Sequence, residues 1–105
     1  MQTQVERRAS RRFRLSLPLM ARLPGHGNVR AYTRDVSSRG VSFSSPAPLP
    51  AGAKLQFVMT LPSEITLSVP MRVQCAAHVI RTQEQDGRSD VTIAAIIDQY
   101  EFLAD

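Results

Sequence analysis

The sequence has no tryptophan, one cysteine and one lysine among its 105 residues, and its only aromatic side chains are four phenylalanines and two tyrosines. The lone Cys75 cannot form a disulfide within the chain, and no second cysteine or nearby histidine stands at the spacing of metal ligands. We therefore expect a buried, apolar cysteine, no metal site, and a core built from Val, Ile, Leu, Met and Phe.

Long hydrophobic runs are also missing. No apolar stretch approaches the ~20 residues that cross a bilayer, and the arginine-rich start lacks the uninterrupted apolar segment of a secretory signal. We expect a cytoplasmic protein with no membrane insertion. The length is sufficient for one domain with a single core.

Positive charge is concentrated in the first part of the sequence. Residues 1–40 hold nine arginines against Glu6 and Asp35, a net charge of +7, whereas residues 41–105 carry −3. The stretch ERRASRRFRL, residues 6–15, alone contains five arginines. Arginine presents a planar fork of donors that matches phosphate or a guanine edge, and it stacks on aromatic planes better than lysine does. The asymmetry predicts an anionic partner, which is nucleic acid, a nucleotide or a lipid surface.

Apolar residues alternate with other residues along most of the remaining chain, as in half-buried β-strands. The alternation is clearest over residues 53–62. Further strands are expected at 15–23, 29–36, 41–45, 65–82 and 90–97. Short strands separated by regular turns predict an all-β barrel or sandwich.

Two segments are harder to interpret. Residues 65–82 fit either two strands or one long, bent strand broken near Pro70, because proline removes a ladder hydrogen bond. Residues 98–105 fit one short helix with Asp98 near its N-cap.

The loop RDVSSRG, residues 34–40, carries the pattern D-x-S-x-x-G on Asp35, Ser37 and Gly40. Asp and Ser stabilise turns by bonding to nearby backbone N–H groups, and Gly permits a positive φ or a close backbone approach. An ordinary connection between strands uses the same residue types, so this loop alone does not define a binding site.

The arginine motif and the loop together resemble the PilZ domain family. The similarity covers nearly the whole chain, including RRASRR, LSLPL, TRDVSSRGVSF and VQCAAHVIR, which is similar to the family's strand ending in Val-x-Arg. The resemblance implies a small antiparallel β-barrel of six or seven strands over residues 15–105, with a very short C-terminal helix. It also implies a flexible arginine-rich arm over residues 1–14, and cyclic di-GMP as the ligand.

The resemblance further implies which arginines bind. The family pattern R-x-x-x-R selects Arg8 and Arg12, followed by the apolar Phe13, although Arg7 and Arg11 have the same spacing. We expect Arg8 and Arg12 to contact phosphate and the Hoogsteen edge of guanine (O6 and N7) through forked hydrogen bonds, and to stack on the base.

The resemblance implies that the loop residues form the remaining hydrogen bonds to the ligand. Asp35 is expected to accept hydrogen bonds from guanine N1 and N2. Ser37 is expected to donate to guanine or phosphate, and Gly40 to let the loop backbone approach the ligand. An arginine directly before the motif, here Arg7, is associated in similar family members with a stacked pair of cyclic di-GMP molecules. We therefore expect two ligands per chain and no other cofactor.

The arm should be mobile without ligand, because it is polar and its arginines repel one another. Ligand binding should fold the arm across the barrel and create a new surface for an unidentified protein partner. The resemblance implies that this partner belongs to the motility, adhesion or exopolysaccharide machinery.

The chain departs from the family pattern in the last strand. Ala94 and Ala95 replace a glycine, and Ile97 replaces an aromatic residue. These changes either close off part of the ligand surface or only alter the packing of the core.

Two other functions remain open. One is an adaptor that binds proteins but not the ligand, although such family members usually lack one of the two motifs. The other is a nucleic-acid-binding barrel with a basic arm. We expect no nucleic acid partner, because Tyr32, Phe43 and Phe57 are separated and expected in the core. Catalysis is not expected either, since neither His26 nor His78 belongs to a recognisable triad.

Overall fold

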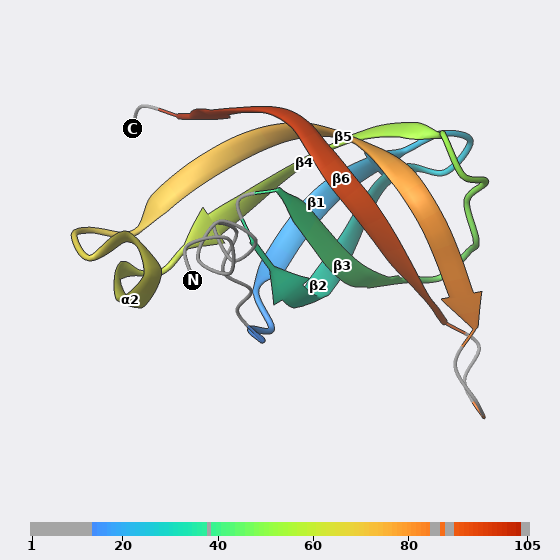
Figure 1. Ribbon diagram of the computed structural model, residues 1–105, viewed down its shortest axis with the longest axis horizontal. Helices are drawn as coiled ribbons and strands as arrows, with labels where there is room; N and C mark the ends of the chain where they lie inside the picture. The colour runs from blue at the N-terminus through green and yellow to red at the C-terminus, as the bar shows by residue number, and fades with distance from the viewer. Residues whose placement is uncertain (1–13, 38, 85–86, 88–89, 104–105) are drawn as a thin grey trace, which may run out of the picture.

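The computed structural model describes residues 14–37, 39–84, 87 and 90–103. Within these residues, six strands form one closed antiparallel barrel with the order β1-β2-β3-β6-β5-β4 (Figure 1). The strands are β1 (Pro18–Leu23), β2 (Gly27–Val36), β3 (Gly40–Ser45), β4 (Lys54–Leu61), β5 (Met71–Glu84) and β6 (Val91–Phe102). The all-β prediction is confirmed, and the fold is a barrel rather than a sandwich.

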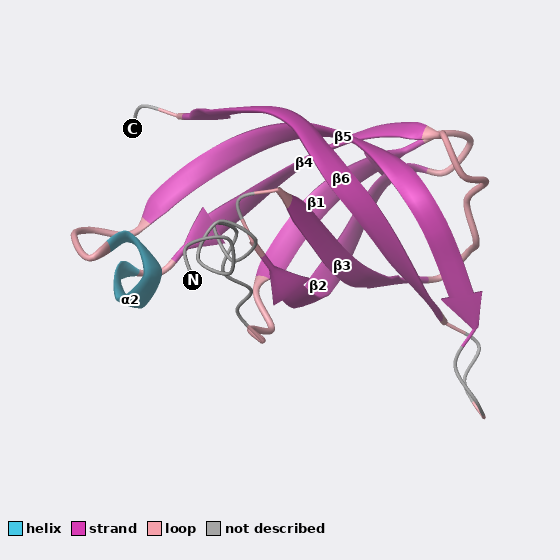
Figure 2. Ribbon diagram, viewed as in Figure 1, coloured by secondary structure: helices cyan, strands magenta, loops and turns pink. Residues whose placement is uncertain are grey.

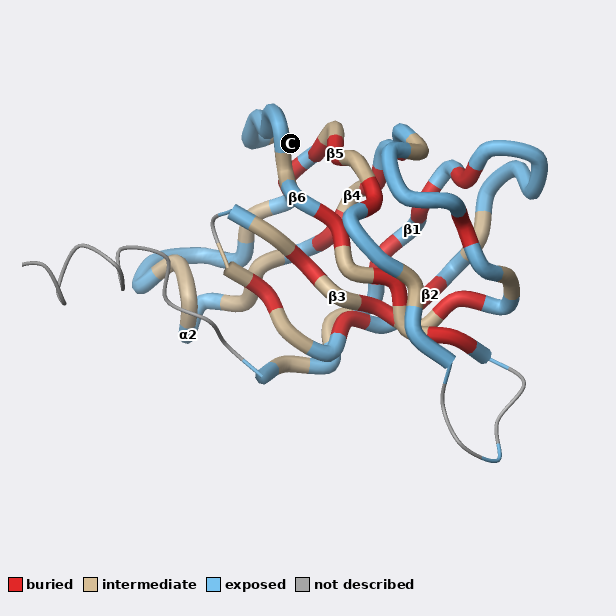
Figure 3. The backbone as a smooth tube through the Cα atoms, turned by 45° about the vertical axis from the view of Figure 1, so that its right-hand side comes forward, coloured by how far each residue is buried: buried red, intermediate tan, exposed pale blue. Residues whose placement is uncertain are grey.

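The barrel interior is built by alternation along each strand. In β4, Leu55, Phe57 and Met59 are buried while the residues between them are exposed or half-buried. Successive side chains of a strand point to opposite faces, so this pattern directs one face of every strand inward. Phe43 and Ile93 have no exposed surface and lie at the centre of the core. Figure 3 shows the buried positions alternating along the strands.

The expected cysteine environment is confirmed. Cys75 is a free thiol on the inner face of β5, and only 2% of its surface is exposed. Desolvation by burial raises the pKa of this thiol to about 11. The thiol therefore behaves as a small apolar core residue. In the part of the chain that the structure describes, no helix is long and apolar enough to span a membrane.

The predicted C-terminal helix is wrong. β6 continues to Phe102, and its last residues pair with Val73–Ala76 of β5. Asp98 does not cap a helix: both of its carboxylate oxygens lie 2.9 Å from Nδ1 of His78 on β5. The long β5 therefore gives these residues backbone partners, which a short isolated helix would lack.

The prediction for residues 65–82 is partly wrong. A single helical turn, α2 (Ser63–Thr66), follows Pro62, and Leu67 ends it in a left-handed conformation with φ 59°. The strand begins only at Met71, after Pro70, and then runs without a break to Glu84. One strand is therefore present rather than two. Figure 2 shows α2 and the end of β6 at the same end of the barrel.

Tyr32 is a further correction. It was expected in the core with Phe43 and Phe57, but 53% of its surface is exposed, whereas both phenylalanines are buried. Its neighbour Thr33 takes the inward position instead. The Thr33 hydroxyl donates to the Leu15 carbonyl and accepts from the Leu17 N–H at 2.8 Å. The Thr33 side chain therefore holds the segment before β1, at Leu15 and Leu17, against β2.

Candidate functional site

Ser37 closes the turn between β2 and β3. Its Oγ accepts hydrogen bonds from the backbone N–H groups of Arg39, at 3.2 Å, and Gly40, at 3.0 Å. Its own N–H donates to the Gly40 carbonyl at 2.9 Å, and its hydroxyl lies 3.3 Å from the same oxygen. This is the turn-forming behaviour expected of serine. Donation from Ser37 to a ligand stays a prediction.

Gly40 makes a close approach, but to the neighbouring strand. A Cβ at this position would lie 3.0 Å from the carbonyl oxygen of Ala95, and Gly40 pairs with Ile96 of β6. Its φ is not in the left-handed region. A side chain at this position would crowd the backbone of β6. The predicted approach of a ligand to Gly40 has no test in the structure.

A β-bulge in β2 places two consecutive side chains outside the barrel. Thr33 is opposite Phe43 and Asp35 is opposite Ser42, so Arg34 is one extra residue on β2. Thr33 is buried, Arg34 is exposed and Asp35 is half-buried. Bulges redirect side chains in this way and are common beside functional sites. Here the bulge makes the Asp35 carboxylate accessible, and its Oδ2 accepts a hydrogen bond from Ser42 Oγ at 3.3 Å.

A cleft of about 520 Å³ lies beside this bulge, on the outer face of the barrel. It extends over four neighbouring strands in the order β2, β3, β6 and β5. Asp35, Ser37 and Gly40 all line it, so the structure brings together the three described residues of the predicted site. The middle of the floor carries small side chains, among them Ser42 and its cross-strand partner Ala94. A small floor leaves room for a ligand against the strands.

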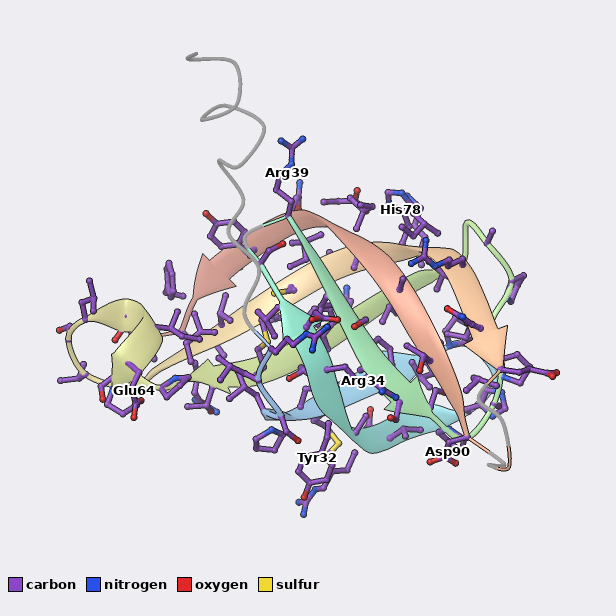
Figure 4. The ribbon with its side chains drawn as sticks, turned by 60° about the horizontal axis from the view of Figure 1, so that its bottom comes forward. Tyr32, Arg34, Arg39, Glu64, His78 and Asp90 are labelled. Atoms are coloured by element: carbon purple, nitrogen blue, oxygen red, sulfur yellow. The ribbon has the colours of Figure 1, made fainter. Side chains whose placement is uncertain are left out.

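Arg34 crosses the cleft. Its Nη1 lies 3.4 Å from Oγ1 of Thr92 on β6, although β3 separates β2 from β6. The guanidinium therefore lies over the outer face of β3. Figure 4 shows Arg34 along the strands, whereas Arg39, at the turn, points away from the barrel. Sequence reasoning missed Arg34 as a site residue, since its place follows from the bulge.

The start of the described chain adjoins the cleft. Arg14 and Ser16 line a smaller hollow together with Tyr32 and Arg34, and Arg34 also lines the cleft. Arg7, Arg8 and Arg12 of the predicted site lie outside the described residues. The segment that follows them nevertheless enters the barrel beside Arg34.

The three residues of the last strand that depart from the family pattern, Ala94, Ala95 and Ile97, do not all lie on the same side of the barrel. Ala94 lines the cleft and is half-buried. Ala95 points inward with 3% of its surface exposed, and Ile97 packs against the core. Ala94 adds a methyl group to the cleft floor, whereas Ala95 and Ile97 contribute to the core, so the effect of these three residues on the ligand surface stays a prediction.

The described residues form a small closed β-barrel with a polar cleft on its outer face, and the arginine-rich segment precedes the first strand in the sequence. The family model of the PilZ domain matches residues 6–97. The chain therefore belongs to the PilZ domain family.

A solved structure of the Bacillus subtilis inhibitor of motility, MotI/DgrA, is similar to this chain, with a TM-score of 0.74 and 16% sequence identity. The similarity covers 90% of this chain and 44% of that protein, so the chain spans less than half of that protein's length. At this identity the likeness shows the fold. The comparison with curated proteins gave no significant match.

Proposed function

We propose that the protein is a receptor for cyclic di-GMP that acts by binding rather than by catalysis. The observation that carries this proposal is the position of Asp35, Ser37 and Gly40 in one cleft, next to the point where the arginine-rich segment enters the barrel. A dinucleotide with two phosphates and two guanines needs both a carboxylate for the base edge and guanidinium groups for the phosphates. Family membership supports this ligand, with the bacterial and cytoplasmic setting that it implies.

Asp35 would hold the first guanine. The Ser42 hydroxyl donates to Oδ2 at 3.3 Å, which orients the carboxylate and leaves Oδ1 and the second lone pair of Oδ2 to accept from guanine N1–H and N2–H. Ser37 and Gly40 would contribute mainly by fixing the turn against β6. The role of Ser37 proposed here is therefore more structural than the sequence pattern indicates.

The arginine arm would complete the site. Arg8 and Arg12 would close over the cleft and bind the phosphates, and Arg7 would cover a second stacked ligand. Because the chain enters the barrel next to Arg34, binding would order the arm beside a cation that already lies in the cleft. The rearranged arm would present the signal to a protein partner.

Two single substitutions separate this function from its alternatives. Arg8→Ala and Asp35→Ala should each weaken binding of cyclic di-GMP by roughly 10- to 150-fold, as expected for loss of a charge-assisted hydrogen bond of about 1.5–3 kcal/mol. Calorimetry measures the ligand, and fluorescence anisotropy measures single-stranded DNA and RNA. Asp98→Ala is the matched control, because Asp98 lies on β6 outside the cleft.

The alternatives give different patterns. A nucleic-acid-binding barrel would lose affinity for the oligonucleotide with Arg8→Ala and hardly with Asp35→Ala. An adaptor would bind neither the dinucleotide nor the oligonucleotide.

Among the described residues, the exposed aromatic pair Tyr100 and Phe102 stacks edge to face at the end of β6, outside the cleft.

A further inference from the structure

The margin of the cleft opposite Asp35 is formed by a second β-bulge. Val79 of β5 is opposite Ala95 and Arg81 is opposite Ala94, so Ile80 is one extra residue on β5. Ile80 and Arg81 are both exposed and both line the cleft. The two bulges therefore face each other across β3 and β6, and each supplies two consecutive side chains to the same cleft.

The two margins differ in chemistry. The β2 margin is polar, with the Asp35 carboxylate bonded to Ser42. The β5 margin combines apolar and polar side chains. Ile80 is 44% exposed, Ile96 of the neighbouring β6 is 37% exposed, and both line the cleft, while Gln83 and Glu84 line it farther along β5. Arg81 adds a guanidinium at this margin. An apolar surface beside a guanidinium suits the face of a heterocyclic ring, since arginine stacks on such planes.

We propose that Ile80, Arg81 and Ile96 form a second base-binding station, which takes one purine of a dinucleotide while Asp35 holds the other. This inference rests on the proposed function and extends it to specificity. A ligand with one base fills only one station, whereas a dinucleotide spans both margins. The β5 bulge therefore makes the protein selective for dinucleotides over mononucleotides.

Calorimetric titrations with cyclic di-GMP test the station. Arg81→Ala and Ile96→Ser should each weaken binding by roughly tenfold, which is the usual size of one lost stacking or charged contact. Arg81→Lys should recover little of the loss, because lysine keeps the charge but not the planar group. Arg30→Ala and Met20→Ser are matched controls: both residues are exposed on neighbouring strands outside the cleft, and both variants should bind as the wild type does.

A second readout separates the two stations. Binding of 5′-GMP at millimolar concentration, followed by the amide shifts of Ser37 and Ser42, which are present in both variants, should be weakened by Asp35→Ala and left unchanged by Arg81→Ala. Equal weakening of 5′-GMP by Arg81→Ala would overturn the second station.

The outcomes also distinguish this inference from the proposed function. Loss of cyclic di-GMP binding with Asp35→Ala, together with wild-type affinity in Arg81→Ala and Ile96→Ser, would defeat the second station and leave the receptor function standing. A wild-type protein that binds no cyclic di-GMP would defeat the receptor function itself.

Discussion

Two walls of the barrel, one formed by β1 and β4 and the other by β3 and β6, bury their inner side chains in the same way but carry different outer side chains. On both walls every second side chain is buried, for example Leu19 and Ala21 on β1, and Val41 and Phe43 on β3. The outer face of the β1–β4 wall carries long, exposed side chains, namely Met20, Arg22, Lys54 and Gln56. On the outer face of the β3–β6 wall, four positions carry smaller, half-buried side chains, namely Ser42, Ser44, Thr92 and Ala94, and Ile96 is exposed beside them.

The alternation on the inner face therefore specifies the barrel, whereas the outer side chains shape the cleft. Substitutions on the solvated face of an antiparallel sheet change stability less than substitutions in the core, so the outer positions can vary while the barrel is kept. Small residues on β3 and β6, between two bulged strands, produce the cleft. The opposite wall has neither feature among the described residues.

Giving the cleft floor a large side chain should have the largest effect. Ala94→Leu places a branched side chain between the two margins and should weaken binding of cyclic di-GMP by at least roughly a hundredfold, about 2.7 kcal/mol. The control is Thr60→Leu on the outer face of β4, which should leave affinity unchanged. Circular dichroism should show an intact barrel in both variants. Tight binding by Ala94→Leu would mean that the cleft is not the site.

Gly40→Ala should disturb the barrel itself. The new Cβ would meet the Ala95 carbonyl at 3.0 Å, and this backbone atom is held in the β3–β6 ladder and cannot move aside cheaply. The expected loss of stability is about 1–3 kcal/mol, as for other overpacked positions. Thermal or urea unfolding measures this loss. An unchanged midpoint would show that β6 shifts freely away from β3.

Ser37→Ala should have a smaller effect that is confined to the turn. The variant loses the acceptor for the N–H groups of Arg39 and Gly40, which should cost about 1 kcal/mol of stability. Faster hydrogen exchange of the Gly40 amide is expected as well. Ser44→Ala is the matched control on β3, because the Ser44 hydroxyl has no hydrogen-bond partner within the described residues. Equal destabilisation by both variants would contradict a specific role of Ser37 in the turn.

Arg30→Ala should have the smallest effect. Arg30 lies on β2, as Arg34 does, but it is exposed on the part that pairs with β1 and does not line the cleft. Removal of Arg30 lowers the net charge by one, as removal of Arg34 does. It should change the affinity for cyclic di-GMP less than twofold, because a single exposed charge outside the cleft is screened by salt. Arg34→Ala removes the same charge from within the cleft and should weaken binding more. An equal loss in both variants would indicate that affinity follows total charge and not the cleft.

The strands could be predicted from the sequence because alternation is a local property. Residues 53–62 show it most clearly, and β4 occupies Lys54–Leu61. The end of β6 could not be predicted in the same way, because Asp98 is an equally good helix cap. Its strand conformation depends on pairing with Val73–Ala76, which lie about 25 residues earlier in the chain.

The candidate site was predictable where its residues are contiguous. Asp35, Ser37 and Gly40 form one short motif, and the structure places all three on one cleft. Arg34 and Arg81 were not predictable as cleft residues, because each depends on a bulge that shifts the register of one strand against its neighbour. Such shifts have no signal in the alternation of a single strand.

Isothermal titration calorimetry of the full chain with cyclic di-GMP, at two salt concentrations, would decide whether the protein is a receptor for this ligand. We predict saturable binding with a dissociation constant of about a micromolar or lower, near −8 kcal/mol, two ligands per chain, and weaker binding at the higher salt concentration. A plateau at one ligand would reject the role of Arg7 in holding a second molecule. No heat at high protein concentration, confirmed by a second method, would contradict the receptor function and favour the adaptor.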